Sequence, residues 1–116
     1  KALAIEGPTF INVLAACPRG WRTPDDAGIQ LGRVAADTCV WPIYEVENGV
    51  WKLNHRPREK KPVEEWLKLQ GRFSHLLRPE NQHTLERYQS DVDREWASLL
   101  AACGVAGKAV GRAIEE

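Results

Sequence analysis

An almost unbroken apolar run near the start of the sequence restricts the fold more than any other feature. Between Pro8 and Cys17, the side chains at positions 10 to 16 are apolar except for Asn12, without the alternation of a half-solvated strand. This pattern predicts a parallel β-strand that is covered on both faces. Such a strand needs neighbouring strands to pair its backbone N–H and C=O groups. We therefore expect the missing strands to precede this segment, and a first residue of Lys rather than Met agrees with a piece of a longer protein.

The residues that follow the run predict a loop and then a helix. Pro18 and Gly20 break the strand, so 17–22 should form a loop at its carboxyl end, the edge at which open α/β sheets bind ligands. Thr23 suits the N-cap of a helix and Pro24 its first helical position. The expected packed face of this helix consists of Ala27, Leu31, Val34, Ala35 and Thr38, and the β-α unit closes near 39–41.

A β-hairpin is predicted over residues 42–54. Asn48-Gly49 suits a two-residue type I′ turn, in which both central residues have positive φ. The resulting register places Glu47 opposite Val50, Val46 opposite Trp51, Glu45 opposite Lys52, and Tyr44 opposite Leu53. The pattern, the turn and the charges agree on this register.

The second half of the sequence is predicted to be helical. After a basic linker at 55–61, a short helix begins at Pro62, carries Val63, Trp66, Leu67 and Gln70 on one stripe, and could end at Gly71. Residues 72–78 form a connector, with Phe73, Leu76 and Leu77 as anchors. Apolar residues at intervals of three and four then predict a long amphipathic helix from Pro79 to Cys103, closed by Gly104. The last dozen residues suggest a weak helix or a frayed tail.

The composition excludes several classes of protein. The 16 basic and 16 acidic residues balance, whereas a nucleic-acid-binding domain usually carries a basic surplus. No apolar run approaches the length of a membrane span, and the beginning of the sequence lacks the order of a signal peptide. These features predict a soluble, cytoplasmic protein that binds neither nucleic acid nor membrane.

Three cysteines form neither a disulfide framework nor a complete metal site in this sequence. Cys17, Cys39 and Cys103 are widely separated, and no CxxC motif or compact Cys/His cluster is present. Taken by itself, Cys17 is most simply a structural thiol. Its position before Pro18, in a loop at a strand end, also suits an iron-sulfur ligand whose companions lie elsewhere. Cys39 and Cys103 are expected to be small buried hydrophobic residues.

Several segments together resemble a known family. The stretches GPTFI at 7–11, AACPRGW at 15–21, WPIYE at 41–45 and KPVEEWLKLQGRF at 61–73 are similar to the C-terminal part of the beta subunit of pyruvate:ferredoxin oxidoreductase. The resemblance extends over residues 1–78, and 79–116 match only loosely. It implies the C-terminal part of an α/β, doubly wound, mostly parallel thiamine-diphosphate-binding domain at 1–78, followed by a C-terminal helical extension at 79–116.

The resemblance also implies an activity, cofactors and partners. Such an enzyme oxidatively decarboxylates a 2-oxo acid, expected here to be pyruvate, with coenzyme A, and passes electrons through [4Fe-4S] clusters to ferredoxin. Cys17 corresponds to the fourth ligand of one cluster, whereas the other three ligands and the thiamine diphosphate and Mg²⁺ sites precede this segment in the family. No catalytic residue is therefore assigned, and the isolated chain is expected to be inactive. The implied partners are alpha, gamma and delta subunits or fused equivalents.

Two other functions stay open at this stage. The same chemistry could act on a branched-chain, aryl (such as phenylglyoxylate) or oxalate-type 2-oxo acid. A different class is a non-catalytic subunit-interaction module without metal.

Arginines and histidines offer weaker candidates for a site. Arg19 and Gly20 are candidate cofactor-binding residues, and Arg19 and Arg22 could place positive charge near an anionic cofactor, coenzyme A or a redox partner. Solvated arginines are an equally good interpretation. His55, His75 and His83 are expected on the surface. The basic run at 56–61 is interpreted as a solvated linker rather than a docking patch.

The five tryptophans are interpreted as packing residues. Trp21, Trp41, Trp51, Trp66 and Trp96 lie beside the ends of expected elements or on expected packing faces. Anchoring of the core or of a subunit interface is therefore favoured over stacking on a ligand.

Overall fold

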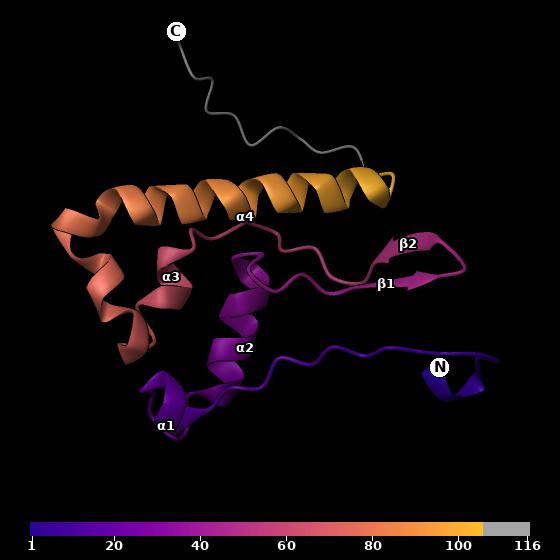
Figure 1. Cartoon of the computed structure of the whole chain (residues 1–116), viewed down its shortest axis with the longest axis horizontal. Coiled ribbons are helices and arrows are strands. Elements are labelled where there is room, and N and C mark those ends of the chain that lie inside the picture. Colours follow the sequence, from indigo (N-terminus) through magenta and orange to yellow (C-terminus); the bar gives the residue numbers. More distant parts are fainter. Residues whose placement is uncertain (106–116) are drawn as a thin grey trace, which may run out of the picture.

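The computed structural model describes residues 1–105, which form a mainly helical chain with one small antiparallel sheet (Figure 1). The mixture of helices and strands is compatible with an α/β domain. The elements, in chain order, are η1 (Ala2–Ala4), α1 (Pro18–Trp21), α2 (Gly28–Asp37), β1 (Tyr44–Glu47), β2 (Val50–Leu53), α3 (Glu64–Leu67), η2 (Gly71–Leu77), η3 (Pro79–Asn81) and α4 (Gln82–Ala102). The tail expected after residue 105 lies outside the described residues.

The hairpin is confirmed in every pair of its register. β1 and β2 are antiparallel, and Tyr44, Glu45, Val46 and Glu47 face the four residues that the turn chemistry predicted. Asn48 and Gly49 have φ values of 51° and 77°, as a type I′ turn requires. The Tyr44 and Trp51 rings, diagonal neighbours, stack with centroids 5.4 Å apart.

The predicted strand over 8–17 is not formed by the described residues. This segment runs extended from the N-terminal turn toward α1 (Figure 1), and its backbone joins no sheet. The side chains of Phe10, Ile11 and Val13 are 89%, 70% and 74% exposed, respectively. The expectation of burial on both faces is therefore wrong for this chain by itself. The physical reason is that a strand is stabilised by backbone pairing, and the described residues offer this one no partner.

The start of the first long helix also differs from the prediction. Thr23 and Pro24 precede a turn closed by a hydrogen bond from Ala27 N to Pro24 O, and α2 begins only at Gly28. The Thr23 N–H donates to Pro18 O at 3.0 Å, so Thr23 continues the turn of α1 and is not an N-cap. Its hydroxyl oxygen is buried and has no hydrogen-bond partner. The predicted loop at 17–22 thus contains one helical turn, α1.

The core lies where α2, α3 and α4 meet. Its buried apolar side chains are Leu31, Ala35, Cys39, Val63, Trp66, Leu67, Leu85, Val92, Trp96, Leu99 and Leu100. The predicted stripe of the short helix is confirmed, because Val63, Trp66, Leu67 and Gln70 are all buried. The α-helical part of that segment is only Glu64–Leu67, and Gly71 begins η2 instead of ending the helix.

The long helix is confirmed with a small change at its start. The η3 turn covers Pro79–Asn81, and α4 continues from Gln82 to Ala102. At the other end, Gly104 has φ +65°, and hydrogen bonds run from Val105 N to Leu100 O and from Gly104 N to Ala101 O. This pair of hydrogen bonds is a Schellman motif, so Gly104 ends the helix as predicted.

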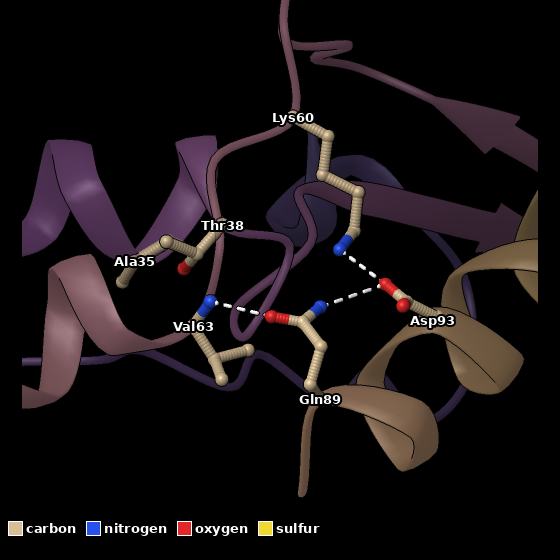
Figure 2. A network of polar contacts seen from close by, with 6 residues as sticks. All are labelled: Ala35, Thr38, Lys60, Val63, Gln89 and Asp93. Carbon is tan, nitrogen blue, oxygen red and sulfur yellow. Dashed lines mark hydrogen bonds and ion pairs between the residues drawn. The ribbon is translucent and has the colours of Figure 1, made fainter. Parts of the chain in front are cut away.

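A polar network joins the basic segment to α4 (Figure 2). Val63 N donates to Gln89 Oε1 at 2.8 Å, and Gln89 Nε2 donates to Asp93 Oδ1 at 2.9 Å. Lys60, whose side chain is 12% exposed, forms an ion pair with the same carboxylate. Lys61 pairs with Asp37 of α2 at 3.1 Å. The interpretation of 56–61 as a solvated linker therefore needs correction at its last two residues, which fasten the segment to two helices.

Candidate functional site

The Cys17 loop presents its sulfur at the end of the extended N-terminal segment. The Cys17 side chain is exposed, and Pro18 fixes the first position of α1. The Gly20 N–H donates to Cys17 Sγ at 3.4 Å. A Cβ at position 20 would lie 3.3 Å from that sulfur, so glycine leaves the approach open. The local sequence thus folds into a tight turn that begins after Cys17, and the Cys17 sulfur accepts a hydrogen bond from a backbone N–H of that turn.

Aromatic side chains hold this loop against the segment that follows α3. Trp21, at the end of α1, meets Trp66 edge to face, with ring centroids 6.0 Å apart. The Arg72 guanidinium carbon lies 4.2 Å from the Trp21 ring centroid and 4.5 Å from that of Phe73. The guanidinium is therefore a shared cation–π partner of two rings on different segments.

A close backbone contact completes the attachment. Gly71 N donates to Arg22 O at 3.0 Å. A Cβ at position 71 would lie 2.8 Å from Arg22 Cβ and 3.1 Å from Arg22 O, so only glycine fits without displacement. Arg22 itself has φ +55°, the left-handed conformation that turns the chain toward this contact.

Arg72 carries a positive charge onto the ring of Trp21, at the end of the turn that follows Cys17. Its Nε donates to Gln70 Oε1 at 2.8 Å, and Gln70 Nε2 in turn donates to Trp66 O at 3.0 Å. Burial lowers the pKa of Arg72, while the neighbouring Cys17 and Tyr88 raise that pKa by smaller amounts. Arginine remains protonated through such shifts. The sequence analysis did not single out Arg72, because its contact with Trp21 joins segments about fifty residues apart.

The structure does not bring the three cysteines together. Cys39 is buried in the core beyond the end of α2, and burial raises the pKa of its thiol to about 11. Cys103 is half-buried and packs against the core after α4. Within residues 1–105, no group of three or more His, Cys, Asp or Glu residues could hold a metal ion. The described residues thus place no such group around Cys17.

The other candidates lie at the surface or in the packing. Arg19 and Arg22 are exposed beside the loop, and His55, His75 and His83 are exposed elsewhere, as the sequence predicted for the histidines. Among the tryptophans, Trp66 and Trp96 are core residues, Trp21 and Trp41 are half-buried, and Trp51 is exposed on the hairpin.

A groove of about 440 Å³ lies between the hairpin and α4, and none of residues 17–22 of the Cys17 loop lines it. Its walls include the aromatic side chains of Tyr44, Trp51, Tyr88 and Trp96, with Asp91 at one side. None of the site residues predicted from the sequence lines it.

In the part of the chain that the structure describes, no helix combines the length and the apolar character that a bilayer crossing requires.

Comparisons with curated proteins give consistent relatives, whereas no model of a protein family matches the sequence. Pyruvate synthase subunit PorB of Thermotoga maritima is 46% identical over 101 residues, which cover 86% of this chain and 31% of that protein. Pyruvate synthase subunit PorB of Methanocaldococcus jannaschii is 43% identical over 82% of this chain and 30% of its own length. Ketoisovalerate oxidoreductase subunit VorB of Pyrococcus furiosus is 43% identical over 92% of this chain and 34% of its own length.

These relatives agree on one kind of subunit while differing in the substrate that they name. The chain spans about a third of the length of the curated relatives it matches. Over most of its own length, this chain is therefore homologous to the beta subunits of 2-oxoacid oxidoreductases.

Proposed function

We propose that this chain is part of a 2-oxoacid oxidoreductase that converts pyruvate and coenzyme A to an acyl-CoA and CO₂, and delivers the electrons to ferredoxin through [4Fe-4S] clusters. The observation that carries the proposal is the similarity to two pyruvate synthase subunits, at 46% and 43% identity over 86% and 82% of this chain. The activity belongs to an assembly with further subunits. The isolated chain is expected to be inactive.

The geometry of the Cys17 loop fits one ligand of an iron-sulfur cluster. The sulfur is exposed, and the Gly20 N–H directed at it would stabilise negative charge on a metal-bound thiolate. The remaining ligands would come from outside this chain, and no described residue is assigned to thiamine diphosphate or Mg²⁺. When bound, the cluster transfers electrons singly and thiamine diphosphate supplies the carbanion chemistry. Arg19, exposed beside the loop, would face an anionic partner.

The proposal also accounts for the exposed N-terminal segment. We propose that residues 8–17 form a strand of a doubly wound thiamine-diphosphate-binding domain, whose other strands belong to a further part of the subunit. Phe10, Ile11 and Val13 would then be covered, and the exposed apolar surface that they form here supports this placement.

Branched-chain 2-oxo acids are the second candidate substrate. The ketoisovalerate oxidoreductase subunit is as similar, at 43% identity, as one of the pyruvate synthase subunits. Comparing kcat/KM for pyruvate and ketoisovalerate in the complete assembly, with viologen as electron acceptor, distinguishes the two substrates.

The test of the cluster assignment is Cys17→Ser in the complete assembly. Iron and acid-labile sulfide should fall, and the low-temperature EPR signal of one reduced cluster should be lost, because serine is a poor substitute for a soft thiolate ligand. Cys103→Ser, a change at a half-buried packing residue, should leave both measurements unchanged. An unaltered EPR spectrum in Cys17→Ser would refute the assignment. An assembly without iron would instead identify a non-catalytic interaction module.

A further inference from the structure

We propose that Arg72 raises the reduction potential of the centre bound by Cys17, by holding a positive charge on the ring of Trp21, in the helical turn that follows the sulfur. The proposal rests on the proposed function, since it takes Cys17 to be a cluster ligand. It adds a residue from η2, more than fifty positions along the chain, to the surroundings of that sulfur.

The position of the Arg72 guanidinium is fixed from several directions. It stacks on Trp21 and Phe73, at 4.2 and 4.5 Å from their ring centroids, and donates to Gln70 Oε1. Gln70 is itself buried and bonded to the backbone of Trp66. An arginine held in this way cannot swing into solvent without losing both stacks and the hydrogen bond. The charge is thus a permanent part of the site.

Trp21 connects this charge to the cluster-ligand loop. It ends the α1 turn that begins with Pro18, and its N–H donates to Cys17 O at 2.8 Å. Gly71, immediately before Arg72, donates to Arg22 O at 3.0 Å. The loop and the arginine are therefore held together by backbone and ring contacts on both sides of Trp21.

No carboxylate neutralises Arg72 within the described residues. The ion pairs of residues 1–105 involve Lys1, Lys52, Lys60, Lys61, Lys68 and Arg94, and none involves Arg72. Arg19 and Arg22 are exposed, so solvent screens their charges more strongly. Reduction makes a cluster more negative by one charge, and a nearby fixed cation favours that state. The predicted effect of Arg72 is therefore a more positive midpoint potential.

The test compares Arg72→Gln, Arg72→Lys and Arg78→Gln in the complete oxidoreductase assembly. The readouts are iron content and an EPR-monitored redox titration of the cluster that Cys17→Ser removes. Arg72→Gln should keep its iron and shift the midpoint potential in the negative direction. Arg72→Lys, which keeps the charge without the planar stack, should stay closer to the wild-type potential. Arg78→Gln, at an exposed arginine on the same segment, should leave the potential unchanged.

The outcomes separate an electrostatic role from a structural one. An Arg72→Gln variant with full iron and the wild-type potential overturns the proposal. If that variant loses its iron, Arg72→Met, which keeps a long side chain without the charge, decides: retained iron with a potential shifted in the negative direction supports the proposal, whereas the wild-type potential or loss of iron here too assigns Arg72 to packing alone. Failure of the proposed function looks different, because the wild-type assembly would then lack iron or Cys17→Ser would retain every cluster signal.

Discussion

The hairpin at 44–53 and the extended segment at 8–17 both have the sequence of β-strands, yet only the hairpin forms a sheet. The two strands of the hairpin are joined by a two-residue turn, so each strand has its pairing partner directly adjacent in the sequence. The segment at 8–17 has a stronger apolar pattern and no adjacent partner. Apolar character therefore predicts where a strand would be buried, whereas pairing decides whether it forms.

The sharpest test of this difference is Phe10→Ala. The ring is 89% exposed in this chain, so the isolated chain should change its free energy of unfolding by less than about 0.5 kcal/mol. In the complete assembly, burial between covering elements should make the same change cost about 3–5 kcal/mol. Thermal or denaturant unfolding of both forms measures the effect. Equal small effects in the two forms would contradict a covered strand at 8–17.

The turn of the hairpin provides the next test. Gly49 has φ +77°, which a β-branched residue adopts only with strain, so Gly49→Val should destabilise the hairpin by about 1–2 kcal/mol or more. Hydrogen exchange of the amides at 44–53 measures the change. Gly32→Ala is the matched control. A Cβ added at this helical glycine would meet open space, so the substitution should stabilise α2 by about 0.5–1 kcal/mol. Unchanged hairpin protection in Gly49→Val would show that the turn does not set the pairing.

The smallest expected effect concerns a contact between the first residue of the chain and the hairpin. Lys1 pairs with Glu45 at 2.9 Å and with Glu47 at 2.8 Å. The hydrogen bond from Lys1 is the largest cause that lowers the pKa of the Glu45 carboxyl. Because the folded pKa is lowered, the stabilisation is present above the unfolded value and is lost as the pH falls through the folded pKa. In an NMR titration, Lys1→Met should raise the pKa of Glu45 toward its ordinary value, and an identical titration curve would refute the pairing.

The candidate site divides in a similar way into local and distant contributions. Pro18 and Gly20 lie within three residues of Cys17, and the sequence predicted the loop at 17–22 from them, while it left Cys17 open between a structural thiol and an iron-sulfur ligand. Arg72, Gly71 and Trp66 reach the same loop only through tertiary packing. No periodicity or spacing could indicate that the Arg72 guanidinium would lie on the Trp21 ring, since that contact joins segments about fifty residues apart.

The sequence by itself determined the hairpin register, the apolar stripes of the helices and the end of α4 at Gly104, because these depend on side-chain period, turn conformation and capping within a few residues. It wrongly predicted a helix start at Thr23 and Pro24, because the Thr23 N–H donates to Pro18 O and so continues the turn of α1. Only the tertiary structure decided that Lys60 and Lys61 bind helices, that Arg72 lies beside the Cys17 loop, and that 8–17 is unpaired here. Each of these depends on which distant groups packing brings within contact distance, and a one-dimensional pattern does not contain that information.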